Sequence, residues 1–213
     1  MTELEFTVLD VVAEPYSAAP NLVAKLRIEE TSDEPVHALV LRAQVRIDAH
    51  RRPYEPAEAQ GLLDLFGPRS RWADTLKPFL WMHATAVVQG FSGSTDVDLV
   101  LPCTYDFDVA GAKYLHALRN GTVPLELLFS GTVFARGETG FSVTQIPWDR
   151  EARHEMPVAV WRELMDQYFP GAGWVRLDRD TLDALSSYKS TRGLTTWEAA
   201  LGQLLAEAEE AAR

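Results

Sequence analysis

The chain has 213 residues, of which 46% are hydrophobic and 24% are charged, and its formal net charge is -11 at pH 7. This length and composition are typical of a folded protein with one domain, or with one domain and an appendage, and they exclude a disordered chain. The acidic excess argues against nucleic acid and anionic lipid as partners, because both are bound by clustered lysine and arginine side chains.

The single cysteine, Cys103, excludes an intrachain disulfide and a zinc site built from several cysteines. The first twelve residues, MTELEFTVLDVV, lack the basic and apolar regions of a secretory signal. No apolar run approaches the roughly 18 residues that are needed to cross a bilayer. We therefore expect a cytoplasmic protein that does not insert into a membrane.

The first half of the chain alternates apolar and polar residues with the period of half-buried strands. After a first strand at residues 4–12, residues 22–28 and 39–47 alternate on either side of the turn-rich segment ETSDEP at 30–35. We predict that these two strands form a β-hairpin. Residues 50–78 contain four prolines and two glycines, which predicts a long insert with one short helix.

The chain then continues with strands and changes to helices. Strands are predicted at residues 79–88, 95–101, 122–135 and 140–148, a helix near 106–120, and three helices after Trp148. Asp178 is expected to cap the second of these three helices, and Thr195 with Glu198 has capping-box spacing at the start of the third. Strands that precede helices, instead of alternating with them, favour an α+β fold.

We predict an antiparallel β-sandwich, immunoglobulin-like or arrestin-like in general form, with a helical C-terminal part. Residues 1–150 are expected to form the β-rich domain of about seven strands, with the insert at 50–78 and the helix near 106–120. Residues 151–213 are expected to form a helical segment that packs on this domain.

No residue pattern amounts to a catalytic or metal-binding motif. Asp96 with Asp98, and Asp106 with Asp108, are pairs that could bind a divalent cation, but neither a third carboxylate nor a glycine-rich ligand loop accompanies them. The five histidines are scattered through the chain. We therefore expect no metal, no cofactor and no enzymatic activity. The rival hypothesis is a metal-dependent hydrolase that uses Asp106, Asp108 and His116.

Two other features are interpreted as structural. Cys103 follows an apolar strand, which favours a buried small hydrophobic residue over a nucleophile. The run Gly90-Phe91-Ser92-Gly93 departs from the G-x-S-x-G pattern of a nucleophile elbow and is interpreted as a turn. The sequence also lacks the glycine-rich patterns that bind nucleotide phosphates.

Basic residues concentrate in one region of this acidic chain. From Arg42 to Lys77 there are seven basic and five acidic residues. Because arginine and aromatic residues are enriched at protein interfaces, we predict a partner-binding surface there, with an ordinary solvated loop as the alternative. The residues predicted for this surface are Arg51, Arg52, Tyr54, Phe66, Arg69, Arg71 and Trp72.

Three of the six tryptophans, Trp161, Trp174 and Trp197, lie in the predicted helical part. Most large aromatic residues are expected in the core. If the helices do not cover one another, however, they leave an apolar groove for a partner segment or for a second copy of the chain. Self-association to a homo-oligomer is therefore an open alternative.

Several runs resemble a known family. These runs are LPCTYDFDVAGAKYLHAL, VPLELLFSGTVF, IPWDREA, PVAVWRELMDQYFP and RDTLDALSSYKSTRGLTTWEAAL. They resemble an uncharacterised actinobacterial family of unknown function whose genes often lie near those for nickel-iron uptake hydrogenases and their maturation factors. The resemblance spans nearly the whole chain and implies an accessory or assembly role. It brings no catalytic residues with it.

A second likeness concerns the order of the elements. Strands followed by a helix at residues 161–168, a glycine-containing break and the run LDRDTLDAL are similar to the SecB export chaperone. SecB has fewer strands and no segment like residues 50–120. This resemblance implies, as an alternative fold, a SecB-like β-sheet plus helices that binds extended polypeptide.

We hypothesise that the chain is a non-enzymatic accessory or assembly factor, linked through the first resemblance to hydrogenase maturation. Its partner would be a protein whose identity the sequence does not reveal. A SecB-like chaperone for unfolded chains and a metal-dependent hydrolase are the alternatives.

Overall fold

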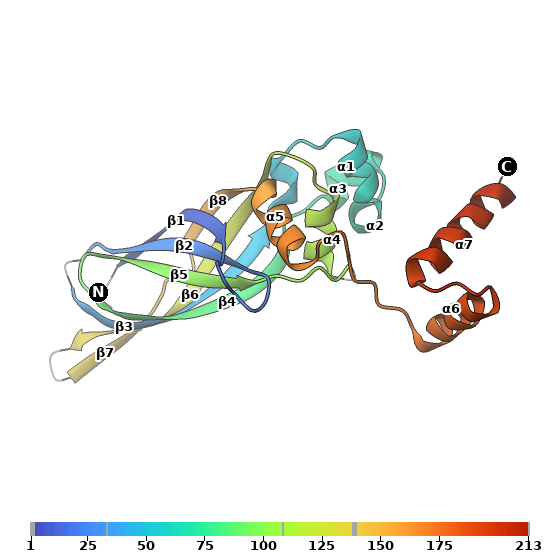
Figure 1. The fold of residues 1–213 in the computed structure, drawn as a ribbon. Helices are drawn as coiled ribbons and strands as arrows, with labels where there is room; N and C mark the ends of the chain where they lie inside the picture. Colours follow the sequence, from blue (N-terminus) through green and yellow to red (C-terminus); the bar gives the residue numbers. More distant parts are fainter. Residues whose placement is uncertain (1–2, 33, 108, 138–139, 213) are drawn as a thin grey trace. The chain divides into compact units, whose positions relative to one another are not determined.

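The computed structural model describes residues 3–32, 34–107, 109–137 and 140–212 (Figure 1). Over these residues the fold is α+β, with two antiparallel sheets and several helices, which confirms the predicted class. The chain divides into two compact units, Met1–Trp174 and Val175–Arg213.

All of the described strands and most of the helices belong to the first unit. The strands are β1 (Leu4–Ala13), β2 (Asn21–Glu30), β3 (Val36–Ile47), β4 (Phe79–Phe91), β5 (Ser94–Pro102), β6 (Thr122–Gly137), β7 (Gly140–Gln145) and β8 (Glu151–Pro157). Its helices are η1 (Ala49–Arg51), α1 (Pro56–Gly61), α2 (Leu63–Phe66), η2 (Arg69–Arg71), α3 (Trp72–Thr75), α4 (Ala110–Ala117) and α5 (Val158–Tyr168). The second unit contains α6 (Arg179–Thr191) and α7 (Trp197–Ala211).

The strands form two sheets with one hydrophobic core. Sheet A has the order β1-β2-β5, and sheet B has the order β4-β3-β6-β7, with β8 also paired to β6. The first half of β6 pairs with β8 and its last residues pair with β7, so β7 and β8 follow one another along the same side of β6. Apolar side chains from both sheets belong to one buried cluster.

The predicted hairpin between residues 22–28 and 39–47 is wrong. β2 pairs with β1 and β5 in sheet A, whereas β3 pairs with β4 and β6 in sheet B. The alternation correctly identifies a buried face on each strand, but it carries no information about which strand lies beside it. β2 and β3 are thus consecutive strands that belong to different sheets.

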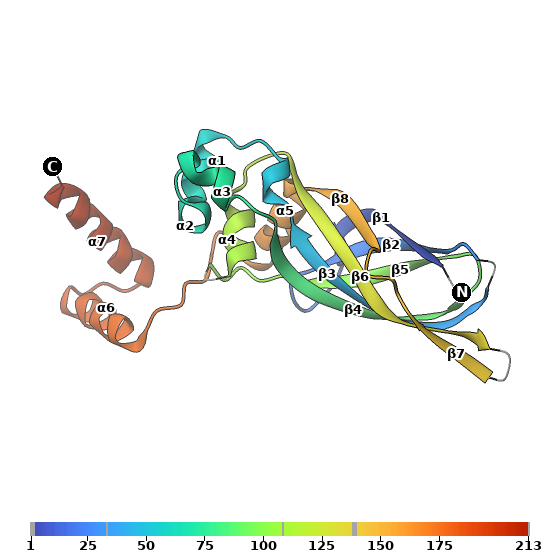
Figure 2. The ribbon, with the colours of Figure 1, turned by 180° about the vertical axis from the view of Figure 1, so that it is seen from behind.

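The helices of the first unit gather at one end of the sheets, and in Figure 2 no helix of this unit lies in front of sheet B. The insert at 50–78 contains more helix than predicted, because α1, α2, η2 and α3 all lie within it. Contacts join α1 and α2 to α4, and α5 to β1, β2 and β8. This arrangement leaves the outer face of sheet B open.

The helical pattern predicted directly after Trp148 begins too early, because residues 151–157 form the strand β8. In this strand Ala152 and Met156 are buried and alternate with charged residues, so the period is two. Only two aliphatic side chains carry that period, which weakened the signal. α5 then begins at Val158. That α6 and α7 also pack on the β-rich part remains a prediction.

The second unit is a pair of helices with little buried apolar surface. The Asp178 side chain caps α6 by accepting a hydrogen bond from the Thr181 backbone N–H at 2.8 Å, as predicted. The cap of α7 is Thr196, which accepts from the Ala199 N–H at 3.1 Å, and the prediction of Thr195 is wrong by one residue. No helix in the described part of the chain is both long and apolar enough to cross a membrane.

Candidate functional site

The outer face of sheet B presents apolar and polar side chains to solvent. On β3, Val40, Arg42 and Gln44 alternate with the buried residues and point away from the core. The register places Val87 of β4 opposite Val40, and His83 opposite Gln44. Val40 is 46% exposed and Val87 is 77% exposed. Two valines side by side in water make this face a candidate contact surface.

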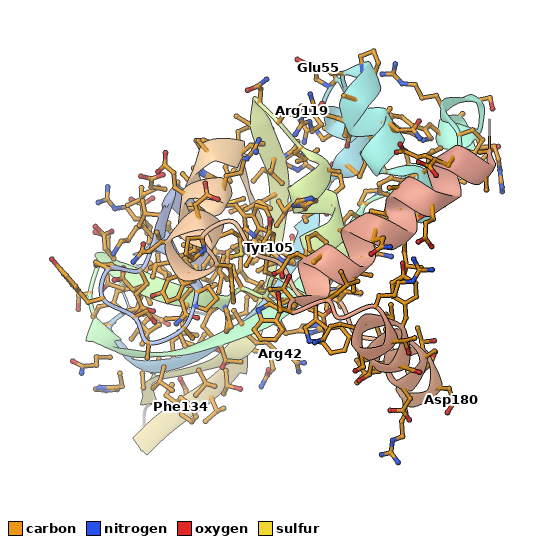
Figure 3. All side chains as sticks on the ribbon, turned by 45° about the vertical axis from the view of Figure 1, so that its right-hand side comes forward. Arg42, Glu55, Tyr105, Arg119, Phe134 and Asp180 are labelled. Carbon is orange, nitrogen blue, oxygen red and sulfur yellow. The ribbon has the colours of Figure 1, made fainter. Side chains whose placement is uncertain are left out.

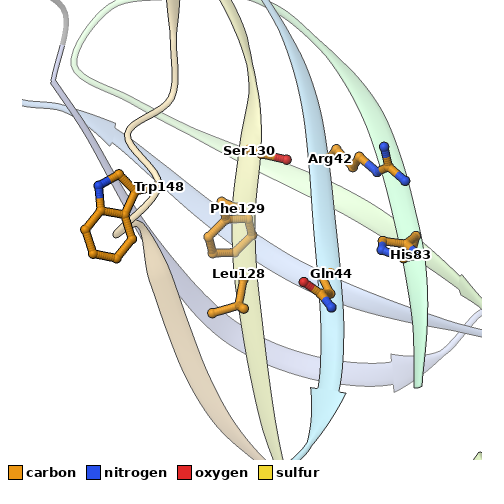
Figure 4. Close-up of a pocket in the computed structure, with 7 residues that line it drawn as sticks. All are labelled: Arg42, Gln44, His83, Leu128, Phe129, Ser130 and Trp148. Atoms are coloured by element: carbon orange, nitrogen blue, oxygen red, sulfur yellow. The ribbon is translucent and has the colours of Figure 1, made fainter. Parts of the chain in front are cut away.

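A hollow of about 440 Å³ lies on this face, where β3, β4 and β6 run side by side (Figure 4). Figure 4 shows Trp148 at one side of the hollow and Arg42 with His83 at the other. The lining residues are Arg42, Gln44, His83, Leu128, Phe129, Ser130 and Trp148. The hollow therefore combines an aromatic wall with a guanidinium group and several hydrogen-bonding groups.

Trp148 lies on a turn whose two ends are hydrogen-bonded to the backbone of β6. The Ile146 N–H donates to the Gly131 carbonyl at 3.0 Å, and the Phe129 N–H donates to the Arg150 carbonyl at 2.9 Å. Gly131 has φ 148°, and a Cβ there would lie 2.0 Å from the Val40 carbonyl oxygen, so only glycine fits. The Trp148 side chain is 92% exposed although its backbone is held in place. Tryptophan is one of the residue types that are enriched among interface hot spots.

Acidic and basic side chains both lie on this face, and most of them are paired. Within the described residues, Arg42 forms no hydrogen bond or ion pair. Glu126 is shared by two arginines, Arg46 and Arg153, each at 3.2 Å. Arg153 also lies 3.3 Å from Glu151. Because Arg42 has no acidic neighbour of this kind, it is available to bind a carboxylate of another molecule.

The residues predicted for partner binding lie in and beside the insert, and several of them stabilise it. Arg52 and Glu58 form a buried ion pair at 2.9 Å, with their side chains 7% and 2% exposed. The Trp72 indole N–H donates to the Gly67 carbonyl at 3.0 Å. Phe66 is buried in the core. These side chains are engaged within the fold.

Tyr54 connects the insert to α4. Its hydroxyl lies 2.7 Å from the Tyr114 hydroxyl, and its ring meets that of Trp72 edge to face at 5.1 Å. Burial raises the pKa of Tyr54 to about 12, and burial also raises the pKa of Tyr114. Both phenols therefore stay protonated at neutral pH.

Three arginines of the predicted surface remain exposed. Arg69 lies over the Trp72 ring at 5.4 Å, while Arg51 and Arg71 point to solvent. A partner that binds these side chains stays a prediction, and they do not line the hollow on sheet B.

The aspartates considered for a metal have other contacts. Asp96 pairs with Arg27 at 2.8 Å, and Asp98 pairs with Lys25 at 2.7 Å, in each case across the β2–β5 register. In the described part of the chain, no group of three or more His, Cys, Asp or Glu side chains could hold a metal ion.

The residues of the hydrolase hypothesis are described only in part. Asp106 forms an isolated β-bridge with Trp174, and His116 Nδ1 lies 2.9 Å from the Tyr105 hydroxyl. Asp108 lies outside the described residues, so the three side chains are not described together.

Cys103 lies after β5, and its thiol contacts the Leu101 carbonyl at 3.5 Å. Burial raises the pKa of this thiol to about 12, so it is protonated at neutral pH and is a poor nucleophile. Ser92-Gly93 connects β4 to β5, which agrees with the predicted turn.

Comparisons with known proteins found one family model, which matches residues 1–213 and is described as "Family of unknown function (DUF6084)". No curated protein matches. Among solved structures, Se-Met labelled beta-glucosidase from Kluyveromyces marxianus is 11% identical, with 73% of this chain and 15% of that chain covered and a TM-score of 0.26. Beta-glucosidase 3B from Thermotoga neapolitana in complex with alpha-D-glucose is 16% identical, with 72% and 17% covered and a TM-score of 0.27. The chain thus spans 15% to 17% of these enzymes, and so low a similarity carries no argument.

Proposed function

We propose that this chain, which belongs to the Family of unknown function (DUF6084), is a non-enzymatic binding protein that recognises a protein partner through the outer face of sheet B. The observation that carries the proposal is the combination of exposed Trp148 with Arg42 around one hollow, next to Val40 and Val87. Tryptophan and arginine are the residue types that contribute most to protein interfaces.

The chemistry of the face defines the partner. Covering the exposed valines and Trp148 removes apolar surface from water, which contributes about 25 cal/mol for each Å² buried. Arg42 can donate two parallel hydrogen bonds to a carboxylate. The proposed partner surface therefore carries apolar side chains beside an aspartate or glutamate.

The strand β7 offers a second point of attachment next to this face. Among the described residues β7 pairs with β6 alone, and its sequence GFSVTQ contains no charged residue and no proline. Charged residues and proline are the features that usually protect an edge strand from pairing. An extended partner segment could thus add to β7 while its side chains contact Val143, which is exposed.

The biological setting that we propose is an accessory or assembly role, with nickel-iron hydrogenase maturation as the setting implied by the sequence resemblance. A SecB-like chaperone is the alternative that the same open sheet face supports, because a chaperone also needs exposed apolar surface beside a strand edge. A dedicated accessory factor binds one partner, whereas a chaperone suppresses the aggregation of many unrelated chains.

Comparative affinity capture from an extract of the source organism tests the proposal. Wild-type protein should retain a defined partner, and Arg42→Glu and Trp148→Ala should each lose most of it. Tyr16→Ala is the matched control for Trp148, because Tyr16 is an equally exposed aromatic residue outside the face. The double variant Arg51→Glu, Arg71→Glu tests the exposed arginines predicted from the sequence.

Loss of the partner in the Arg51/Arg71 variant, with retention by Arg42→Glu and Trp148→Ala, would move the binding surface to the insert and overturn the proposal. Equal suppression of aggregation for several unrelated unfolded proteins would favour the chaperone. Failure to capture any partner above background would count against a binding function.

A further inference from the structure

A second hollow, of about 240 Å³, has largely aromatic walls. Tyr105, labelled in Figure 3, and Phe107 come from the segment between β5 and α4, and Phe169 follows the last turn of α5. The centroid of the Tyr105 ring lies 5.1 Å from that of Phe107 and 5.7 Å from that of Phe169. Three aromatic rings from two distant parts of the sequence thus border one space.

The backbone holds this wall in position. The Phe107 N–H donates to the Trp174 carbonyl at 3.3 Å, which ties the segment before α4 to the segment after α5. At Gly173 a Cβ would lie 2.6 Å from the Phe107 ring, so the glycine backbone packs directly against that ring. Any larger residue at position 173 would displace Phe107.

Among the described lining residues, Asp166 supplies the charge of the hollow. Asp166 on α5 is exposed and lines the space, and within the described residues it forms no hydrogen bond or ion pair. Arg162, one turn earlier, borders an adjoining hollow of about 50 Å³ that shares Tyr105, His116 and Asp166 with the larger one, and it donates to the Arg119 carbonyl at 3.3 Å. Among the described residues that line the larger hollow, Asp166 carries the negative charge and none is basic, while Arg162 lies beyond Asp166 in the adjoining hollow.

His116 completes the wall as a neutral ring. Its centroid lies 4.6 Å from that of Phe107, and its Nδ1 lies 2.9 Å from the Tyr105 hydroxyl. Burial, together with the charge of Arg162, lowers the pKa of His116 below its usual value. The neutral form of the imidazole is thus favoured at neutral pH, so His116 itself adds no positive charge to the wall.

Aromatic faces beside a carboxylate select a particular class of ligand. The negative face of an aromatic ring attracts a cation, and a methylated ammonium group gives up its water more readily than a bare ammonium group. We propose that this hollow binds a small organic cation with a methylated or quaternary ammonium group, contacted by the rings of Tyr105, Phe107 and Phe169 and balanced by Asp166. This site is independent of the partner surface on sheet B.

Isothermal titration of the full chain with choline tests the site, with 3,3-dimethylbutan-1-ol as an uncharged probe of the same shape. Choline should bind saturably at one site. The affinity of the alcohol should be at least about tenfold lower, because the alcohol lacks the attraction to the rings and to Asp166. Equal binding of the two probes would show a simple apolar hollow and would overturn the proposal. Absence of saturable choline binding would also overturn it.

Variants assign the binding to these residues. Asp166→Asn should weaken choline binding several-fold, and Phe169→Ala should weaken it further, while Glu163→Gln, an exposed carboxylate on the same helix, should leave it unchanged. Because Asp166 is exposed, its substitution should not affect folding, which the melting temperature checks. If Glu163→Gln weakens binding as much as Asp166→Asn does, the attraction is non-specific and the assignment is wrong.

Discussion

Phe6 on β1 and Phe129 on β6 stack their rings across the two sheets, with centroids 4.3 Å apart and planes at 18°. Both rings are buried. The contact joins sheet A to sheet B through the interior, so its loss reports directly on the stability of the sandwich. The same strand β6 carries Leu128 and Ser130 on its outer side, which links the core to the proposed partner surface.

Truncation of Phe129 should destabilise the protein strongly. Phe129→Ala leaves a cavity between the sheets and should lower the free energy of unfolding by about 3 to 5 kcal/mol, measured by urea denaturation. Val87→Ala, on the outer face of the same sheet, should change it by less than about 0.5 kcal/mol. Similar losses for both variants would contradict the assignment of inner and outer faces.

Glu58 should make stability depend on pH. Burial alone would raise the pKa of its carboxyl, but hydrogen bonds from the Arg119 and Glu55 backbone N–H groups and the charge of Arg52 lower it overall. Because the folded pKa lies below the unfolded value of about 4.3, the stabilisation is complete above that value and is lost as pH falls through the folded pKa.

Glu58→Gln should therefore lower the free energy of unfolding at pH 7 by about 3 kcal/mol or more, because it leaves Arg52 buried without its counter-charge. The difference from wild type should shrink as pH falls below about 4. The exposed Glu163→Gln variant should show neither effect. A difference between Glu58→Gln and wild type that does not change with pH would refute the role of this carboxylate.

The thiol of Cys103 should be nearly inert in the folded protein. Because burial raises its pKa to about 12, the thiolate is scarce at pH 8, and alkylation by iodoacetamide should be slow. Denaturation in urea should restore the rate of an ordinary cysteine. Fast stoichiometric alkylation of the native protein would mean that the thiol is accessible and ionised.

The cap of α7 should depend on Thr196. Thr196→Ala removes the hydrogen bond to the Ala199 N–H and should destabilise the helix by about 1 kcal/mol. Hydrogen exchange of the first amides of α7 should become about fivefold faster. Thr195→Ala is the matched control and should leave the exchange unchanged. Faster exchange in Thr195→Ala, with no change in Thr196→Ala, would show that Thr195 is the cap, as the sequence pattern predicts.

The strands of the first unit were largely predictable because alternation reports which side chains are buried. Val40 and Leu41, for example, are assigned to opposite faces of β3 by sequence alone. Strand pairing was not predictable in this way, because a buried face fits equally well beside a neighbouring strand or across the core. Because of this ambiguity, the sequence predicts a pairing of β2 with β3 that the structure does not contain.

The candidate site was harder to predict than the fold. Arg42 and Trp148 are more than 100 residues apart in the sequence, with His83 between them. The pairing of β3 with both β4 and β6 places the three around one hollow. The charge pattern predicts a binding surface on the insert, because composition does not show that Arg52 is paired with buried Glu58. The exposed tryptophan in IPWDREA was the available signal, since it is a large aromatic side chain in a turn.

Oxidative footprinting of the protein, alone and with its captured partner, tests the central claim most directly. The partner should protect Trp148 from oxidation, while Tyr16, equally exposed in the free protein, should remain reactive. If the partner instead protects residues 51–71 or another region, and Trp148 is oxidised as fast as in the free protein, recognition through the outer face of sheet B is contradicted.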